Sequence, residues 1–536
     1  MTRHTDDSDA FALSVQRVLR SPLPADRRFT PLALRGKTHS LEVLAPAATS
    51  PLREADVWAC VVAMLATIIG GGALSVPYAF KLCGLRGGLL LLALSALASD
   101  FALYALCSAS RRTGTATLAE LAKAAQGPYL ENAVVVALFL LCGFVAIAYT
   151  RLLRDLLGLF LAPFFQKDAI IVDRALVLCA TFVLFPLSLY RELYRLRYAA
   201  FISFGGALCV AALFTFRAWP TLTQLGDPTS LGDRARAKLR PTPDNSSSLL
   251  AVALVALPIM SMSFLCQFNV LSVHARLKKP TRERLKLLLH TVVAMAFLFY
   301  VVFGVAGMIV CADAPDDVAQ DALSCLSYAD KQQQSSGTKC STDILLACAG
   351  GSFAVALLLN TPALVIPLRD SCLVLCSKAY YAASSTTKTQ RRARRKQTTE
   401  RTPLANIEED GLPPQDDAKT TEEATAESGP SSSSSKQQQL SATFVHVTVT
   451  ACIIVVVIIG AQRVPGVASV WAVAGSSVGL FVAYLLPCYL YLKVRGHKDD
   501  GPARIRKAFC AILFVSSLVL AVLCTYRNAK AILFGA

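Results

Sequence analysis

The chain has 536 residues, of which 54% are hydrophobic and 17% are charged, and its mean hydropathy is +0.50. A soluble domain carries about a quarter charged residues, whereas many windows of about 20 residues here are almost uncharged, the length that crosses a bilayer. This composition excludes an ordinary soluble domain and predicts a polytopic membrane protein. We attribute the net charge of +17 to residues that flank membrane segments, and expect no nucleic-acid partner.

Residues 1–55 are polar and lack an apolar core with a cleavage site, so they predict a disordered cytosolic tail instead of a signal peptide. Hydropathy then predicts eleven membrane-spanning helices. Their ranges are 56–80, 87–109, 131–161, 169–190, 198–218, 249–273, 287–311, 344–376, 441–461, 467–493 and 506–526. We therefore expect helices 1–8 within 56–376, a disordered cytosolic loop over 377–440, rich in Ser, Thr, Gln and Glu, and helices 9–11 within 441–536.

Basic residues in the loops predict the topology. Most of them fall on one side if the spans alternate, which places the N-terminus in the cytosol and the C-terminus on the other side. The exception is the loop after the fifth span, which carries Arg234, Arg236, Lys238 and Arg240. That non-cytosolic side also holds a glycosylation sequon at Asn245.

Two cysteines, Cys325 and Cys340, lie in the acidic loop after the seventh span, on the side where a disulfide is permitted. A disulfide between them and two free thiols are both open at this point. The remaining cysteines lie mostly inside apolar segments, and their spacing does not predict a metal site.

The first span contains a run of poor helix formers, "IIGGGALSVPYAF", with glycines at 70–72 followed by Pro77. A broken membrane helix is tolerated only where it lines a protein cavity, and transporters use such breaks to bind substrate. We therefore favour an unwound binding segment over close helix packing by glycine. Span six offers a matching interruption at Pro258, followed by Ser261 and Ser263, although Pro258 alone could be an ordinary kink.

Several blocks of the sequence resemble one family in its own order. They are "IIGGGALSVPYAFKLCGL", "SDFALYALCSASRRTGTATLAELAKAAQGPY", "FPLSLYRELYRLRYAAFISF", "FLCQFNVLSVHARLKKPTRERL" and "NTPALVIPLRDS". These blocks are similar to those of the amino acid/auxin permease family, in the branch of the sodium-coupled neutral amino acid transporters and vacuolar amino acid transporters.

The resemblance implies an all-α fold of about eleven helices, with five-plus-five inverted repeats of the amino acid–polyamine–organocation type and one extra helix. It implies a substrate site between helices one and six, without catalytic residues or a bound metal. The implied substrate-binding residues are Thr67, Ile68, Gly70, Gly71 and Gly72 on helix one, and Phe264 and Gln267 on helix six.

The coupling ion, H⁺ or Na⁺, stays open. Sodium-coupled members have an Asn just before the glycines, and this chain has Ala66 there. Gln267 stands where many relatives have His and cannot carry a proton. The candidates for coupling are Asp100, a carboxyl group inside span two, and Asn360 and Thr361 in span eight. For Asp100, a structural carboxylate that caps backbone amides or meets an Arg is an equal alternative.

Two further pairs have structural interpretations. Arg151 and Asp155 are four residues apart, so they share a helix face, and a structural ion pair is favoured over a contact with substrate. Gly475 and Gly479 form a GxxxG motif in span ten, for which tight helix packing is favoured over a ligand role.

The sequence thus predicts a secondary transporter for amino acids that works by alternating access, as a multi-pass glycoprotein and symporter in the plasma membrane or an endolysosomal or vacuolar membrane. The alternative is a membrane sensor that binds an amino acid and signals through its cytosolic segments. We expect a small-molecule substrate and the lipid bilayer as partners, and no organic cofactor. The oligomeric state is open.

Overall fold

The structure is a computed structural model that describes residues 53–161, 169–189, 197–227, 230–241, 249–319, 321–334, 350–362, 364–379, 432–464, 466–495 and 501–534. The chain divides into two compact units. The larger comprises Thr30–Ser371 and Thr450–Ala536, and the smaller comprises Met1–Phe29 and Cys372–Val449. Everything below that concerns packing or a site lies within the larger unit.

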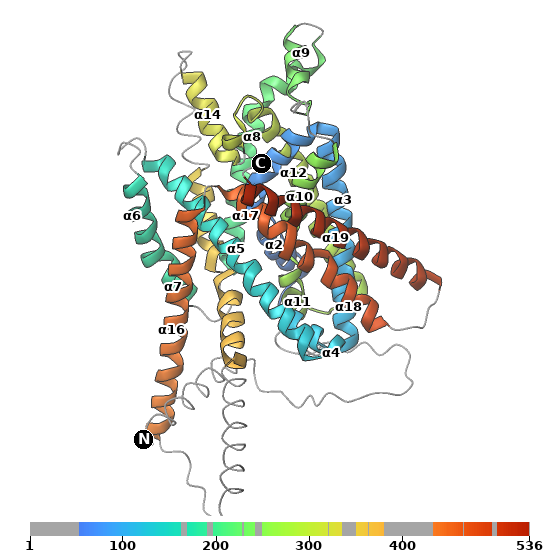
Figure 1. Cartoon of the computed structure of the whole chain (residues 1–536), viewed down its shortest axis with the longest axis vertical. Coiled ribbons are helices and arrows are strands. Elements are labelled where there is room, and N and C mark those ends of the chain that lie inside the picture. The colour runs from blue at the N-terminus through green and yellow to red at the C-terminus, as the bar shows by residue number, and fades with distance from the viewer. Residues whose placement is uncertain are drawn as a thin grey trace, which may run out of the picture. The chain divides into compact units, whose positions relative to one another are not determined.

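The described part of the chain is helical, as predicted (Figure 1). Ten of its helices are long and apolar enough to cross a membrane. The elements of the first seven spans are α2 (Val57–Ile68), η1 (Gly71–Ser75), α3 (Val76–Thr113), α4 (Leu118–Gln126), α5 (Pro128–Leu161), α6 (Ala169–Cys179), η2 (Ala180–Leu184), α7 (Phe185–Ser188), α8 (Arg197–Thr223), η4 (Gln224–Gly226), α9 (Ser230–Ala237), α10 (Leu249–Ser263), α11 (Gln267–Arg276) and α12 (Arg282–Val310). They are followed by α13 (Asp316–Ala319), α14 (Ala322–Gln334), the helix Gly350–Ala379, α16 (Ser432–Arg463), α17 (Val467–Ala474), η5 (Gly475–Gly479), η6 (Phe481–Leu485), α18 (Leu486–Arg495) and α19 (Gly501–Phe534).

Helix α3 contains the end of the first predicted span and the whole of the second. Gly84 separates the two parts, because its φ of 71° and ψ of 172° are not helical. A positive φ of this kind is open to glycine at little cost. The count of ten long helices therefore corresponds to the eleven predicted spans. The short helices α4, α9 and α14 lie in loops for which no helix was predicted.

Residues 432–440 differ from the expectation of a disordered loop over 377–440. Helix α16 begins at Ser432 and runs into the ninth span without a break. The segment "SSSSKQQQL" contains Lys, Gln and Leu, which are good helix formers, and it extends a helix that the apolar span has already started. Residues 1–52 of the predicted tail 1–55, most of the predicted loop and the sequon at Asn245 lie outside the described residues. Residues 53–55 differ from the expectation of disorder, because Arg53 is buried and Ala55 forms backbone hydrogen bonds with Arg276 and Lys278.

The core of the larger unit forms where α3 packs against α10 and α12 (Figure 1). Glycines bring these helices close together. A Cβ on Gly304 would meet the Phe80 ring at 2.7 Å, and a Cβ on Gly307 would meet Pro77 at 2.3 Å. Because the small residues of α12 admit the bulky side chains of α3, the segment after the glycine run is held firmly against span seven.

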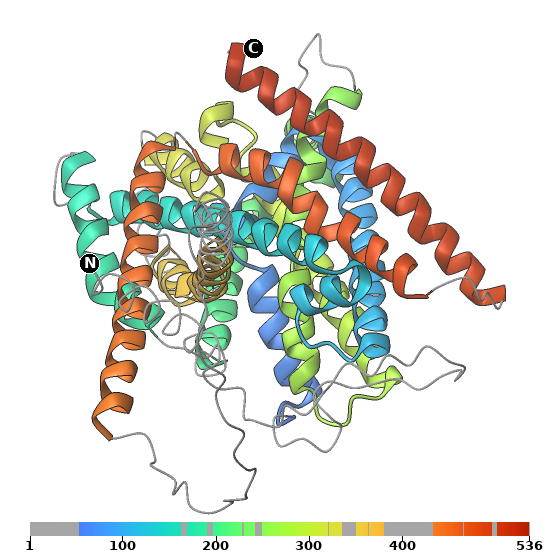
Figure 2. The same ribbon diagram turned by 60° about the horizontal axis from the view of Figure 1, so that its bottom comes forward.

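Helix α19 presents an apolar face to its surroundings and crosses the outside of the bundle in dark red (Figure 2). Its exposed residues recur at helical spacing and share one face: Ile505, Ile512, Val515, Val519 and Val522. Exposing such an apolar stripe to water is energetically unfavourable, whereas exposing it to a hydrocarbon layer is not. The exposed face is therefore the lipid-facing surface of an integral, multi-pass membrane protein.

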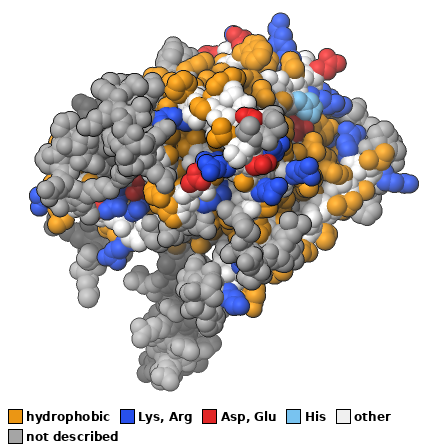
Figure 3. Space-filling model, turned by 90° about the horizontal axis from the view of Figure 1, so that it is seen from above, with side chains coloured by type: hydrophobic (Ala, Val, Ile, Leu, Met, Phe, Trp, Pro, Cys, Tyr) orange, Lys and Arg blue, Asp and Glu red, His pale blue; other side chains and the backbone are white. Residues whose placement is uncertain are grey.

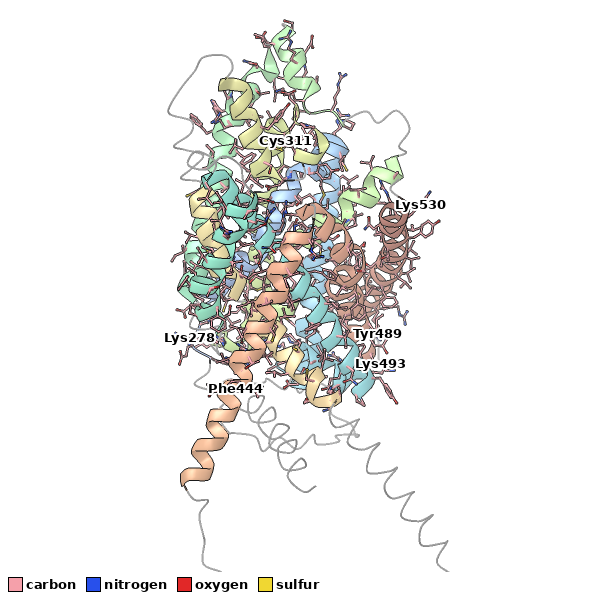
Figure 4. The ribbon with its side chains drawn as sticks, turned by 60° about the vertical axis from the view of Figure 1, so that its left-hand side comes forward. Lys278, Cys311, Phe444, Tyr489, Lys493 and Lys530 are labelled. Carbon is pink, nitrogen blue, oxygen red and sulfur yellow. A yellow bond between two sulfur atoms is a disulfide. The ribbon has the colours of Figure 1, made fainter. Side chains whose placement is uncertain are left out.

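The bundle has two ends, which we name by their contents. Residues 53–56, α4 and the connection between α11 and α12 lie at the N-terminal end, and Cys311 with α9 and α14 lies at the disulfide end. Lys278 and Cys311 mark the two ends in Figure 4. The orientation of the two ends relative to the cytosol is predicted from the basic residues alone.

At the disulfide end, Cys325 pairs with Cys311, with Cα atoms 5.2 Å apart. The pairing with Cys340 that the sequence left open is thus replaced by one within the described residues, and Cys340 lies outside them. Sequence spacing alone did not favour Cys311, because it stood at the edge of the predicted seventh span. The disulfide ties α14 to the end of α12.

Asp321 caps the start of α14. Its carboxylate accepts hydrogen bonds from the Ser324 hydroxyl (3.0 Å) and the Leu323 N–H (3.3 Å). Burial, and secondly the negative charge of Asp155, raise the pKa of Asp321 from 3.8 to about 6. The folded protein therefore holds this proton to a higher pH than the unfolded chain does.

We expect the protein to lose stability as pH rises from about 4 through 6, because over this range the native state binds more protons at Asp321 than the unfolded state. The Asp321→Asn variant stays neutral and should show a flatter profile. Thermal unfolding of both proteins between pH 4 and 8 measures the difference. Parallel profiles for the two proteins would contradict the assignment.

Candidate functional site

The first span is broken at the predicted glycines. Helix α2 ends at Ile68, and the second half starts with the short 3-10 turn η1 at Gly71. Between them, Ile69 (φ −85°, ψ 67°) and Gly70 (φ −114°, ψ −152°) leave helical geometry. The interruption frees main-chain groups inside the bundle, as the sequence predicted.

Side chains from other spans satisfy the freed carbonyls. The Gly70 N–H donates to the Ile68 carbonyl at 3.0 Å instead of to the Ala66 carbonyl, its acceptor in a regular helix. The Ala66 carbonyl therefore has no helical donor. The Asn360 side-chain amide donates to that Ala66 carbonyl at 3.3 Å and to the Ser203 hydroxyl at 2.5 Å. Spans five and eight therefore both support the break in span one.

The second break lies in span six, but not at Pro258. Helix α10 continues through Pro258 to Ser263, and α11 starts at Gln267, so the unwound residues are 264–266. A proline removes the donor to the carbonyl four residues earlier, which here is that of Leu254. The Cys524 thiol of α19 donates to this carbonyl at 3.4 Å, so the helix passes the proline without unwinding.

Tyr300 of α12 joins the two breaks. Its hydroxyl lies 2.8 Å from both the Ile68 carbonyl and the Ser263 carbonyl, where α2 and α10 end. Its ring meets the fully buried Phe264 ring edge-on, with centroids 5.3 Å apart. One side chain thus holds the carbonyl ends of both half-helices in a fixed relation.

Two more polar contacts connect the broken spans. The Asn269 amide donates to the Thr67 hydroxyl at 3.3 Å. The Ser263 hydroxyl lies 3.5 Å from the Gly72 carbonyl and donates to the Ile259 carbonyl at 2.9 Å. The structure therefore brings the predicted helix-one residues Thr67, Ile68 and the three glycines to the same place as the predicted helix-six residues.

Gln267 begins α11 and is fully buried. Its side-chain oxygen accepts the Cys266 N–H at 2.9 Å, whereas its side-chain NH₂ group has no acceptor among the described residues. A buried donor without a partner costs about 1–3 kcal/mol. This NH₂ group is therefore a donor that a bound molecule can satisfy.

Tyr149 of α5 lies against the break in span one, and the sequence analysis did not single it out. A Cβ added to Gly70 would lie 1.8 Å from the Tyr149 hydroxyl oxygen, so the phenol packs directly against the glycine main chain. No motif marks Tyr149, because a tyrosine in a membrane helix is common. The run of glycines in span one indicated a close approach by another group, but it did not indicate that this group is Tyr149.

The two candidates for coupling in span eight are placed differently. The Thr361 hydroxyl donates to the Leu357 carbonyl of its own helix at 2.7 Å. Asn360 offers its NH₂ group to oxygen acceptors, and the Ala66 carbonyl fixes that orientation because it can only accept. Asn360 therefore directs its NH₂ group, and not its side-chain oxygen, toward the break in span one.

Asp100, the third candidate, contacts a histidine. Its carboxylate lies 2.9 Å from the ring Nδ1 of His290 on α12. His290 was not singled out in the sequence, because its partner is 190 residues away. Neighbouring Ser99 is fully buried and meets the Tyr484 hydroxyl at 3.2 Å, so this part of α3 packs against span ten.

The structural interpretations of two other motifs are confirmed. Arg151 and Asp155 form an ion pair at 3.2 Å. Gly475 and Gly479 both pack on Met262 of α10, since added Cβ atoms would meet its side chain at 2.8 and 2.3 Å. Span ten has π-helical turns there, η5 and η6, a geometry that recurs beside functional sites.

Hydrogen bonds join two segments at the N-terminal end of the bundle. The Ala55 N–H donates to the Arg276 carbonyl at 3.0 Å, and the Lys278 N–H donates to the Ala55 carbonyl at 2.9 Å. The buried Arg53 guanidinium donates to the carbonyls of His274 and Leu277 at the end of α11. We call residues 53–56 and 274–278 the latch.

The architecture is that of a membrane transporter: a bundle of about eleven helices, of which the first and sixth are interrupted opposite each other. The family model described as transmembrane amino acid transporter protein matches residues 53–528. The chain therefore belongs to the transmembrane amino acid transporter family and is not an enzyme, which confirms the resemblance found in the sequence.

Individual relatives are distant. A Danio rerio protein that carries the name of a sodium-coupled neutral amino acid transporter is 29% identical over 245 residues, which are 45% of this chain and 52% of that protein. Vacuolar amino acid transporter 5 of Schizosaccharomyces pombe is 28% identical over 264 residues, 47% of this chain and 58% of that protein. The chain thus spans about half the length of these curated relatives.

Among solved structures, a Na⁺-coupled sialic acid symporter in a substrate-bound, outward-open state is similar with a TM-score of 0.49 at 13% identity. That similarity covers 98% of this chain and 96% of that one. A nucleobase-cation-symport-1 family transporter in a closed conformation has a TM-score of 0.45 at 11% identity, over 90% and 96% of the two chains.

Proposed function

We propose that the protein is a secondary transporter that moves amino acids across its membrane by alternating access. The observation that carries this proposal is the pair of opposed helix breaks joined by Tyr300, 2.8 Å from the last carbonyls of α2 and α10. A helix end carries a partial charge, negative at the carbonyl end and positive at the amide end. Opposed breaks therefore suit a zwitterion, whose two charges need partners of opposite sign.

In this proposal the second half of span one binds the substrate carboxylate. The first N–H groups of a helix have no acceptor of their own, and here these belong to Gly71 and Gly72 at the start of η1. The ammonium group would lie at the carbonyl ends of α2 and α10. Because glycine has no Cβ, the main chain is accessible to the substrate at this point.

The described side chains at the two breaks are uncharged, which favours substrates with neutral side chains. They are Thr67, Tyr149, Ser263, Phe264, Gln267, Asn269, Tyr300 and Asn360. A charged substrate side chain would need a buried counter-charge, because an unpaired charge is costly to bury. The Gln267 NH₂ group instead offers a neutral hydrogen bond.

We further propose that protons drive transport through the pair of Asp100 and His290. A carboxylate and an imidazole at 2.9 Å can take up and release a proton, and they connect spans two and seven. Span seven also carries Tyr300, so a change of charge in the pair acts on the helix that holds both breaks. Sodium is less well supported, because Asn360 already donates to the Ala66 carbonyl.

Reconstitution in liposomes tests the function. We expect labelled neutral amino acids to accumulate when a proton gradient is imposed, and to exchange with unlabelled amino acid in its absence. Separate sodium and proton gradients, at equal membrane potential, identify the driving ion. If no amino acid in a full panel accumulates or exchanges, the proposal of transport is wrong.

For the coupling pair we expect Asp100→Asn and His290→Gln to remove the response of uptake to the proton gradient while exchange persists. Neither replacement can carry the proton, yet both keep a hydrogen-bonding side chain. Asp233→Asn, an exposed carboxylate on α9, is the control and should behave like the parent protein. An undiminished response to the gradient in both variants would exclude the pair as the coupling site.

A further inference from the structure

The basic run after the fifth span is the exception to the charge pattern of the loops, and the proposed substrate site does not use it. In the structure this run forms α9 and the turn that follows. The turn folds onto the Gly84 junction: the Leu85 N–H donates to the Leu239 carbonyl at 3.1 Å, and a Cβ on Gly84 would meet Pro241 at 2.7 Å. Basic side chains are thereby fixed beside span one.

A cavity of about 530 Å³ opens at this place. It is lined by Lys81, Arg234, Ala237, Lys238, Arg240, Pro241, Ala312 and Asp313. Four of these side chains are cationic and one is a carboxylate. Figure 3 views the molecule from this end and shows Lys and Arg side chains beside a few acidic ones.

The cations differ in how they are compensated. Lys238 pairs with Asp313 at 2.7 Å. Lys81 is only 4% exposed and donates to the Ala314 carbonyl at 2.7 Å. Arg234 and Arg240 have no carboxylate partner in the described part of the chain, whereas Arg236, outside the cavity, pairs with Asp233 at 3.1 Å.

We propose that this cavity binds a phosphate-bearing anion. Positive charges that converge on one cavity repel each other and attract a counter-ion. Guanidinium groups present paired N–H donors that match the oxygens of a phosphate, and a buried ammonium adds a point charge. The volume is in the range of small-ligand sites, so it accommodates more than a bare halide.

Two sources can supply the phosphate. The basic run that lines the cavity follows α8 in the sequence. Trp219 of α8 is 61% exposed, and exposed tryptophan in a membrane helix marks the level of the lipid head groups. An anionic phospholipid head group is therefore one source of the phosphate. Inorganic phosphate in solution offers the same chemistry.

Binding would connect three parts of the disulfide end. Lys81 belongs to the second half of the broken span one, Arg234 and Arg240 belong to the basic run, and Asp313 follows span seven. Pro77, one turn before Lys81, already packs on Gly307. A bound anion therefore holds the second half of span one against span seven, and any effect of this on transport rests on the proposed function.

The test measures binding alone, so it is independent of whether amino acids are transported. The full-length protein is titrated with inorganic phosphate in detergent, against sodium chloride of matched ionic strength, and its thermal unfolding midpoint is recorded. A second arm compares phosphatidylcholine nanodiscs with and without phosphatidylglycerol. The test variant is Arg234→Gln/Arg240→Gln, and the matched control is Arg236→Gln from the same run.

We expect a rise of several degrees in the parent protein and in the control, but not in the double variant, as for any ligand that binds only the folded state. A rise with phosphate identifies the free ion, and a rise with phosphatidylglycerol alone identifies the head group. No rise in either arm, or an equal rise in the double variant, overturns the proposal. If the double variant does not fold, each single variant is measured, with a reduced rise expected in both.

Discussion

Replacing Gly70 by alanine should reduce amino acid uptake on the order of 100-fold, an effect typical of an ångström-scale displacement in a preorganised site. The added Cβ would lie 1.8 Å from the Tyr149 hydroxyl oxygen and 2.9 Å from the ring carbon that bears it. The backbone angles of Gly70 are open to other residues, so the constraint is space. Either Tyr149 leaves its position or the unwound segment moves.

Initial uptake rates of the reconstituted protein measure the effect. Gly205→Ala is the matched control, since a Cβ there meets nothing within 4 Å and alanine favours the helix. Adding Tyr149→Phe to Gly70→Ala removes the closest atom and should restore part of the activity. Normal uptake by Gly70→Ala would show that Tyr149 is free to move aside and that this contact does not shape the site.

Tyr300→Phe should destabilise the protein by about 1–3 kcal/mol, the cost of leaving buried polar groups without a partner. The variant keeps the ring and its edge-on contact with Phe264. It loses only the hydroxyl that lies 2.8 Å from both the Ile68 and Ser263 carbonyls. Uptake should fall as well, because the two half-helix ends are no longer held together.

Thermal unfolding and uptake are measured on the same preparation. Tyr526→Phe, at a tyrosine that is 71% exposed, removes the same atom without a buried partner and should be neutral. A variant at Tyr300 that unfolds at the parent temperature and transports normally would show that the bridge between the breaks is dispensable. A loss of uptake with unchanged stability would instead assign the hydroxyl to substrate binding.

Much of the fold could be predicted from the sequence, because apolar length and glycine content act locally. The eleven spans and the break at Gly70–Gly72 followed from composition alone. The second break was wrongly predicted at Pro258, because proline is a local signal whereas the freed Leu254 carbonyl is satisfied by Cys524, 270 residues later in the chain. The unwound residues 264–266 contain neither glycine nor proline.

The site itself could be predicted only in part. The residues on spans one and six were found through a resemblance to known transporters, and the structure brings them together. Tyr149, Tyr300 and His290 were missed as candidates, because each contacts its partner from a distant part of the chain. Cys311 was missed for a different reason: hydropathy placed it at the end of a span, where a cysteine is read as a small apolar residue.

The latch at the N-terminal end makes opening of this end measurable by hydrogen exchange. Its two hydrogen bonds between backbone groups, from Ala55 to Arg276 and from Lys278 to Ala55, join segments that we expect to separate if this end opens in the proposed transport cycle. Their amide protons therefore exchange with deuterium only from the open form. In the proposed cycle, the deuterium exchange rate at Ala55 and Lys278 therefore measures how often this end opens, without any added substrate.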